Sequence, residues 1–444
     1  MSLGNKNQKI RASGGTEVIW YFILLRSLYI TYVKIHTMFT PNNTYHCSEE
    51  TYFRLANHSL EHALEQNRIT TTDRKLIEKY ALRLKSKISP GRYNKIVSML
   101  VNVRRYFDVE FSQVDEDAYL IALSNIKYAK HTCGKHKGEP YSKNTIVDWM
   151  KITKRFFLFL VEQNLTTVPK KTIQETEVGV YDIHTKTDAD VLTAEEIDQL
   201  ISAAKSLKFK AYIGLLYETG ARSIEMANLR WKDITVQTWG IQCTLHDTKT
   251  DKIRTVPCVM YAQYVHLWRN QYPGDASGDN FVFVTRYNKP IQYRGVLKEI
   301  DRCREAAGIT KRITLHIFRH SRITHVLREG MSETLVKKAF WGNAKTNMIE
   351  TYGHLTSDDI RIQYMKMAGV TVDEEKPDIS PKPITCSRCH KILPPGTSYC
   401  PDCGMALTEA AAEKVNDAVK IVDDVLLKLP QDVRMLIAQK LNLL

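Results

Sequence analysis

Apolar residues recur at three- and four-residue spacing from about residue 48 to residue 164. This spacing places them on one face of a helix, so the pattern predicts a series of amphipathic helices. Pro90 follows Ser89 at one of the breaks, as at many helix starts. The expected helices span residues 48–67, 71–87, 89–107, 115–131 and 143–164. Together they predict a helical bundle.

After residue 190 the pattern changes between helical and strand-like segments. Thr193 and Glu196 have the spacing of a capping box at a helix start. The stretches GIQCTLHD (240–247) and IRTVPCVM (253–260) have the composition of strands and flank the polar turn TKTDK. Helical spacing returns at 315–330. These segments predict a mainly α fold with a small antiparallel β-sheet.

The net charge narrows the class of partner. The chain has 444 residues, enough for two or three domains, and a formal charge of +14. Such a charge fits a polyanion, although a ribosomal or membrane-surface protein would also carry it. Basic residues line the polar faces of the first helices, so we expect this bundle to clamp DNA, with an ordinary solvated surface as the alternative. They are Arg92, Lys95, Arg104, Arg105, Lys143, Lys151, Lys154 and Arg155.

A set of five residues in the second half has the chemistry of phosphoryl transfer on a nucleic acid. Arginine binds phosphate oxygens with a planar, permanently charged fork. Lysine or histidine can protonate a leaving oxygen, and tyrosine can attack phosphorus as a covalent nucleophile. Each residue alone is more simply a surface charge or a packing group. The set consists of Arg222, Lys249, His316, Arg319 and Tyr352.

The motifs around these residues resemble those of the tyrosine recombinases, the family of phage integrases and Xer-type recombinases. They are ARSIE (221–225), TKTDKIRTVP (248–257), HIFRH (316–320) and a tyrosine followed by GHL (352–355). The resemblance covers about residues 190–368 and, through its helical pattern only, about 50–165. It implies a site-specific recombinase that cleaves and rejoins DNA. The implied alternatives are a type IB topoisomerase-like nicking-closing enzyme and a catalytically impaired DNA-binding regulator.

The resemblance also implies a role for each residue. Arg222 and Arg319 would clamp the scissile phosphate. Lys249 would protonate the leaving 5′ oxygen, with Lys252 on the same hairpin as the alternative. His316 would assist proton transfer. The 3′-phosphotyrosyl bond would form on Tyr352.

One position departs from the family pattern. The family usually has His or Trp nine residues before the nucleophile, and that place is Asn343 here. Asparagine can donate one hydrogen bond to a phosphate but cannot titrate. Trp341 would fill the place only with a gap in the alignment.

Neither ATP nor a catalytic metal is expected. The chain has no G-x-x-x-x-G-K-[ST] motif. His316 and His320 have the i, i+4 spacing of a zinc pair, but HIFRH offers neither the usual glutamate nor a third ligand nearby.

Four cysteines near the C-terminus predict a structural zinc ribbon. Two C-x-x-C pairs so close together favour tetrahedral Zn²⁺ over a redox pair. The ligands would be Cys386, Cys389, Cys400 and Cys403. The ribbon could contact DNA or protein. The other five cysteines are scattered, which favours a reducing, cytoplasmic location over a disulfide framework.

The two ends of the chain have characters of their own. Residues 405–444 predict amphipathic helices broken at Pro430, which we expect to contact a neighbouring protomer; docking on the same chain is the alternative. Residues 18–33 are apolar but interrupted by Arg26, and short for a membrane span. Translation from Met38 is the preferred hypothesis for this leader, and a membrane anchor is the alternative.

The expected domain order follows from these segments. Residues 1–45 form the leader, 46–165 the helical core-binding domain, 166–190 a linker and 191–368 the catalytic domain. A second linker spans 369–385, the zinc ribbon 386–404 and the C-terminal helices 405–444. By resemblance, the partner is double-stranded DNA at specific sites, bound by a homotetramer on paired sites, and no membrane is involved.

Overall fold

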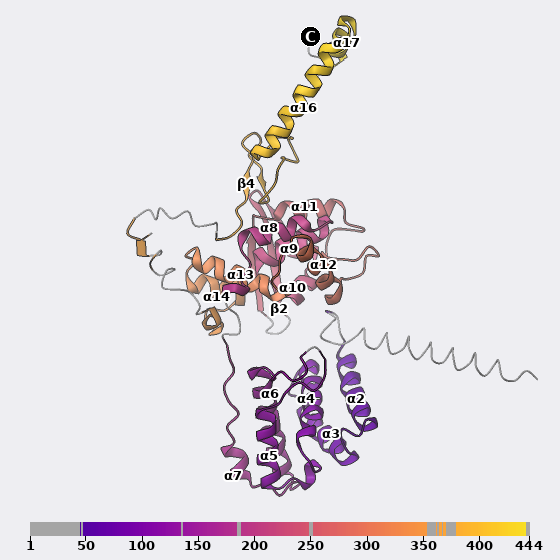
Figure 1. The fold of residues 1–444 in the computed structure, drawn as a ribbon, viewed down its shortest axis with the longest axis vertical. Coiled ribbons are helices and arrows are strands. Elements are labelled where there is room, and N and C mark those ends of the chain that lie inside the picture. Colours follow the sequence, from indigo (N-terminus) through magenta and orange to yellow (C-terminus); the bar gives the residue numbers. More distant parts are fainter. Residues whose placement is uncertain are drawn as a thin grey trace, which may run out of the picture. The chain divides into compact units, whose positions relative to one another are not determined.

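The fold is that of a computed structural model, which describes residues 45, 48–134, 136–183, 188–247, 252–352, 361, 364–365, 367–369 and 379–440. The chain divides into two compact units, residues 1–182 and 183–444 (Figure 1). Except for Tyr45, the predicted leader lies outside the described residues, as does the hypothesis of a start at Met38. No helix in the described ranges has the length and apolar character needed to cross a membrane.

The first unit is built from the helices that the apolar spacing predicted. Side chains of Ser48, Thr70, Ser89, Asp115 and Ser142 cap their N-termini by accepting backbone N–H groups, which explains where each helix begins. The helices are α2 (Glu49–Glu65), α3 (Thr71–Lys85), α4 (Pro90–Val103), α5 (Glu116–Lys127) and α6 (Lys143–Glu162). In Figure 1, α4 lies among α2, α3 and α6, and α5 packs against α6.

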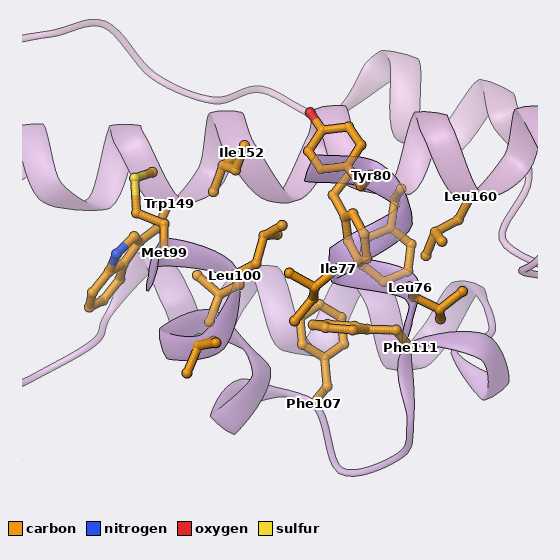
Figure 2. Packing of buried hydrophobic residues seen from close by; sticks show 14 of the residues in the cluster. Leu76, Ile77, Tyr80, Met99, Leu100, Phe107, Phe111, Trp149, Ile152 and Leu160 are labelled. Atoms are coloured by element: carbon orange, nitrogen blue, oxygen red, sulfur yellow. The ribbon is translucent and has the colours of Figure 1, made fainter. Parts of the chain in front are cut away.

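One continuous apolar core holds this bundle together. Aromatic rings dominate it, with Phe111, Phe156 and Phe157 fully buried and in mutual contact. Figure 2 shows how Leu76 and Ile77 of α3 meet residues of α4 and α6 in this core. Burial of such side chains contributes roughly 1.5–3 kcal/mol each, so the bundle has a substantial core of its own.

A buried ion pair joins α3 to the segment after α4. The Asp73 carboxylate is fully buried and accepts from Arg104 Nε at 2.6 Å, from Thr70 N at 3.1 Å and from Phe111 N at 2.9 Å. With these donors around it, the carboxylate is satisfied without water. The apolar spacing gave no sign of this contact, because it depends on a polar residue inside the core.

The predicted linker of residues 166–190 is partly folded onto the first unit. It contains α7 (Lys170–Glu175), whose Ile173 is fully buried and which packs on α6. Tyr181 donates to Asp148 Oδ1 at 2.7 Å and lies against Lys151. The sequence of this segment shows no helical period, because it is mostly polar and, of its described residues, only Val168 and Ile173 are buried in the core.

The second unit begins with helices and then forms a small sheet. Thr193 and Glu196 make the predicted capping box at the start of α8 (Ala194–Ala203). Next come α9 (Leu207–Thr219), α10 (Ser223–Asn228), β1 (Ile234–Gln237), β2 (Gly240–Asp247) and β3 (Lys252–Cys258). The three strands form an antiparallel sheet in the order β1-β2-β3, which confirms the predicted hairpin. Later elements are α11 (Ala262–Asn270), α12 (Tyr293–Ala306), α13 (Leu315–Arg328), α14 (Glu333–Trp341) and the 3₁₀ helix η6 (Met348–Tyr352).

Helix α9 is the centre of this unit. Its residues 211–219 are all buried, and α8, α11 and α13 pack around it. A Cβ on Gly214 would lie 2.6 Å from Cβ of Tyr261, so α11 can approach only because residue 214 has no side chain. The buried Glu218 carboxylate accepts from the backbone N–H groups of Val259, Met260 and Tyr261, which fixes the end of β3 against α9.

The C-terminal part of this unit contains the cysteine motifs and two helices. Strands β4 (Ile384–Thr385) and β5 (Ile392–Leu393) pair antiparallel beside the cysteines. Helices α16 (Glu409–Lys428) and α17 (Gln431–Lys440) follow, separated at Pro430 as predicted. Ser380 of the second predicted linker is buried and hydrogen-bonds Glu329 after α13.

Candidate active site

Arg222 lies on the turn between α9 and α10. Gly220 ends α9 in the left-handed conformation, with φ of +54°, and Arg222 is the N-cap of α10. Its Nη1 donates to Glu225 Oε1 at 3.0 Å and to Asp247 Oδ2 at 2.7 Å, and its backbone N–H donates to Glu225 Oε2 at 2.8 Å. About 27% of its side chain is exposed, so the guanidinium is held firmly but remains accessible.

Arg319 lies on α13 and reaches the same turn from the other side. Its Nη1 donates to the Gly220 carbonyl at 2.6 Å and its Nη2 to the Phe340 carbonyl at 2.7 Å. The residue is only 2% exposed. Two predicted arginines therefore meet at residues 220–222, although they are nearly a hundred residues apart in the chain.

The two histidines of HIFRH lie on the more open side of α13. His316 is exposed, and the His316 and His320 rings are perpendicular with centroids 4.6 Å apart. Because Arg319 is buried while His316 is exposed, the helix presents a histidine at the surface above the buried arginine.

Asn343 and Trp341 have different surroundings. The Asn343 side-chain oxygen accepts from the Lys345 backbone N–H at 3.0 Å, which is a local turn. Within the described part of the chain its Nδ2 group donates no hydrogen bond. The Trp341 ring lies over the Arg319 guanidinium, 5.0 Å from Cζ to the ring centroid. This distance is typical of a cation–π contact.

Two of the predicted catalytic residues lie wholly or partly outside the described structure. Lys249 lies outside the described residues, whereas Lys252 is half-buried at the start of β3, opposite Asp247. Tyr352 ends η6, but its side chain is outside the described part. Both remain predictions.

Sequence reasoning overlooked three charged residues at this site. Arg254 Nη2 donates to Glu225 Oε2 at 2.5 Å, and Asp247 holds Arg222 from β2. Glu225 lies within the ARSIE motif and Arg254 within TKTDKIRTVP, so the motifs contained them without indicating a role. Only the fold brings α10, β2 and β3 together.

The four predicted cysteines form one cluster. Their sulfur atoms all lie within 4.8 Å of one another, with Cys386–Cys403 at 3.6 Å and Cys389–Cys400 at 3.5 Å. Four thiolates about 2.3 Å from one Zn²⁺ would be separated by nearly these distances. Backbone N–H groups, that of Cys389 first, lower the pKa of the Cys386 thiol to about 7. The residues therefore fit a tetrahedral metal ion.

The two cysteine pairs also share one backbone geometry. The N–H of Cys386 donates to the Lys391 carbonyl, and that of Cys400 donates to the Met405 carbonyl. The residue after each second cysteine, His390 or Gly404, has positive φ. This repetition turns both C-x-x-C segments toward the same point.

Part of the second unit is similar to proteins of a known family. Residues 190–358 match the phage integrase family. Tyrosine recombinase XerC 2 of Ralstonia nicotianae is 30% identical over 182 residues, which cover 38% of this chain and 51% of that protein. Tyrosine recombinase XerD of Oceanobacillus iheyensis is 27% identical over 240 residues, which cover 51% of this chain and 77% of that protein. The match thus spans about half the length of the first relative.

Among solved structures, the Tn1549 transposon integrase in complex with a circular intermediate DNA has a similar fold. The TM-score is 0.50 at 16% identity, and the match covers 66% of this chain and 99% of that one. At this identity the likeness supports the fold.

Proposed function

We propose that this chain, whose residues 190–358 are a phage integrase family domain, is a site-specific tyrosine recombinase. The observation that carries the proposal is the meeting of Arg222 and Arg319 at the Gly220 turn. Two arginines can stabilise the negative charge that develops on a phosphodiester under attack, and such stabilisation is usually the largest catalytic contribution.

The remaining steps are assigned to the other predicted residues. Tyr352 attacks the phosphorus, forms a 3′-phosphotyrosyl bond and releases a 5′-hydroxyl strand. Lys249 donates the proton that this leaving oxygen needs, and His316 assists proton transfer. The phosphotyrosine retains the energy of the broken bond, so a second 5′-hydroxyl can attack it and reseal DNA without ATP.

Asn343 takes the sixth position of the site. Its oxygen is engaged with Lys345 N, which leaves the Nδ2 group as the donor toward a phosphate oxygen. Trp341 instead packs on the Arg319 guanidinium and helps to hold it in place.

Covalent trapping tests the proposal. The wild-type protein should form a covalent adduct on a nicked suicide substrate that carries its site, and Tyr352→Phe should abolish the adduct without loss of DNA binding. Tyr364→Phe, at an exposed tyrosine, is the matched control and should react normally. Absence of a wild-type adduct would favour a DNA-binding regulator, and site-independent relaxation of supercoils would favour a topoisomerase-like enzyme.

The first unit is proposed to grip the duplex beside the site. Lys151 and Arg155 lie on α6, the longest helix of the bundle, and Arg92 and Lys95 lie on α4. Neutralising phosphates with such residues releases counterions, so binding should weaken steeply with salt.

We also propose a homotetramer on paired sites, to which α16 adds a contact between protomers. Residues 413–425 of α16 are all exposed, yet its apolar residues follow a heptad spacing that is typical of a helix partner. The core positions would be Val415, Ala418, Val422 and Val425.

Charge favours a parallel pair of α16 helices from two copies. In an antiparallel pair centred on Ile421, Lys414 would face Lys428 of the other copy, whereas a parallel pair places these lysines beside apolar residues. Val422→Glu should therefore lower the mass measured by light scattering, and Leu427→Glu, on the outer face, should not. An unchanged mass for Val422→Glu would contradict the contact.

A structural Zn²⁺ bound by Cys386, Cys389, Cys400 and Cys403 completes the proposal. The ion would supply cohesion to a segment with little apolar core, whose buried cluster consists of Cys386, Leu393 and Cys400.

A further inference from the structure

Four charged side chains connect the β2–β3 hairpin to the turn that holds Arg222. Asp247 Oδ2 lies 2.7 Å from Arg222 Nη1, and Glu225 Oε1 lies 3.0 Å from the same nitrogen. Glu225 Oε2 lies 2.5 Å from Arg254 Nη2. The side chains therefore form a continuous chain from Asp247 through Arg222 and Glu225 to Arg254.

This cluster is buried and balanced in charge. The side chains of Arg254, Glu225 and Asp247 are 5%, 0% and 7% exposed. Two arginines and two carboxylates sum to zero, so the cluster has no excess charge to be neutralised by solvent. Buried ion pairs contribute little net stability, because desolvation offsets the attraction, whereas removal of one partner is costly. The cluster is therefore better suited to fixing positions than to holding the fold together.

Asp247 and Arg254 connect the cluster to strands β2 and β3. Asp247 is the last residue of β2, and Arg254 is the third residue of β3, paired with Leu245. The two strands are joined by residues 248–251, which include Lys249 and lie outside the described residues. A shift of this hairpin would consequently pull on Arg222.

Arg254 also touches two other segments of the site. Its Nη1 donates to the Thr219 carbonyl at 3.4 Å, at the end of α9, and to the Ala339 carbonyl at 3.3 Å, in α14. Gly342, at the end of α14, lies against β3. A Cβ added to this glycine would lie 3.5 Å from the Ile253 carbonyl oxygen. One guanidinium thus joins the Arg222 turn, the hairpin and the helix that leads to Asn343.

Among the described residues, the contacts of Arg222 involve only one of the nitrogen atoms of its guanidinium group. Nη1 is held by both carboxylates, while in the described part of the chain Nε and Nη2 donate no hydrogen bond. A phosphodiester can accept from Nε and Nη2 together, which is the bidentate geometry that arginine favours.

We infer that Asp247 and Arg254 are positioning residues, which couple strands β2 and β3 to Arg222 so that its guanidinium meets the phosphate in one fixed orientation. The inference rests on the proposed recombinase function and names two residues outside the set of six assigned above. A misplacement of about 1 Å at a reacting centre can cost on the order of 100-fold in rate.

Single-turnover cleavage of a suicide substrate tests this coupling. Asp247→Asn removes one charge with little change of shape. Arg254→Lys keeps the charge but removes the planar guanidinium that donates several hydrogen bonds at once. Each should slow formation of the covalent adduct by about 10- to 100-fold, while affinity for uncleaved DNA stays within about twofold. The double variant should be slowed less than the product of the two single effects, because both act through Arg222.

Two comparisons separate positioning from general damage. Asp73→Asn weakens the equally buried Asp73–Arg104 pair in the other unit, and it should lower the melting temperature without changing the adduct rate. A neutral methylphosphonate at the cleaved linkage removes the charge that Arg222 must meet, so the defect of Asp247→Asn should shrink on this substrate. The inference is wrong if the slower adduct formation is fully explained by weaker DNA binding or by a lower melting temperature. It is also wrong if Asp247→Asn slows adduct formation as much on the neutral linkage as on the natural one.

Failure of the inference and failure of the proposed function give different results. If the wild-type protein forms no adduct, the proposed function fails. If the wild type forms an adduct and both variants form it at the same rate, the function stands and only the coupling is overturned.

Discussion

Arg222 and Arg319 differ in what their guanidinium groups contact. Arg222 is held by carboxylates and partly exposed, whereas Arg319 is buried and donates to two carbonyl groups. Arg319 is thus fixed by backbone carbonyls at the ends of α9 and α14, whereas Arg222 is fixed by side chains of α10 and β2.

Asn343 provides a test of the sixth position. Asn343→Ala removes the proposed donor and should slow adduct formation by about 10- to 100-fold, the value of one hydrogen bond to a charged group. Trp341→Phe keeps a ring over Arg319 and should react at nearly the wild-type rate. The opposite order of the two rates would assign the donor to the Trp341 indole.

His325 predicts an acid sensitivity of the second unit. Burial, with Arg322 and Arg328 nearby, lowers the pKa of His325 from 6.5 to about 3, while its Nδ1 lies 2.8 Å from the Tyr217 hydroxyl. Below pH 6.5 the His325 imidazole is protonated in the unfolded chain but stays neutral in the folded chain. The free energy of unfolding therefore falls as the pH is lowered from 6.5 toward 3.

The size of this effect follows from the pKa. At about 1.4 kcal/mol per pH unit, the loss reaches on the order of 3 kcal/mol near pH 4. His325→Gln retains an acceptor for Tyr217 and should flatten the fall in the free energy of unfolding between pH 6.5 and 4. If urea titrations show the same fall in the free energy of unfolding between pH 6.5 and 4 for both proteins, His325 is not the cause.

Among the elements, α9, α13 and α14 depend on one glycine. A Cβ on Gly220 would overlap the Phe340 ring, and the residue has φ of +54°. Gly220→Ala therefore combines a backbone cost of about 1 kcal/mol with a steric cost of about 1–3 kcal/mol. Gly278→Ala has the same φ with no atom within 4 Å and isolates the backbone cost. Urea unfolding should show the larger loss for Gly220→Ala; equal losses would mean that α14 can move away freely.

The cysteine knuckles predict metal dependence without catalytic involvement. The purified protein should contain about one Zn²⁺ per chain, and Cys400→Ser should remove it, whereas Cys133→Ser, at an exposed cysteine, should not. Chelation should make residues 386–404 sensitive to protease but leave adduct formation intact. Loss of adduct formation on chelation would contradict a purely structural ion.

The elements were largely predictable, and the contacts between them were not. Apolar spacing predicted α2 to α6, and the turn-flanked strands predicted β2 and β3, because both patterns reflect local burial. The α7 helix was overlooked because few apolar residues anchor it. The Asp247–Arg222 and Arg254–Glu225 contacts were overlooked because residues 25 and 29 positions apart meet only after the sheet has packed on α10.

At the scale of the whole molecule, the two units have separate cores and complementary proposed tasks. The first is a helical bundle with basic residues on its surface, and the second holds the paired arginines. Residues 386–440 extend the chain beyond the segment that matches the integrase family. The proposed zinc ribbon and the heptad helix are therefore additions whose effect should appear in assembly rather than in cleavage.

In the proposed reaction, Tyr352 becomes covalently linked to the 3′ phosphate of the cleaved strand. Mass spectrometry of a protease digest of the trapped adduct tests this linkage most directly. We expect one nucleotide-bearing peptide, modified at Tyr352, together with a released strand that ends in a 5′-hydroxyl. A different modified residue, or a 5′-phosphate on the released strand, would contradict it.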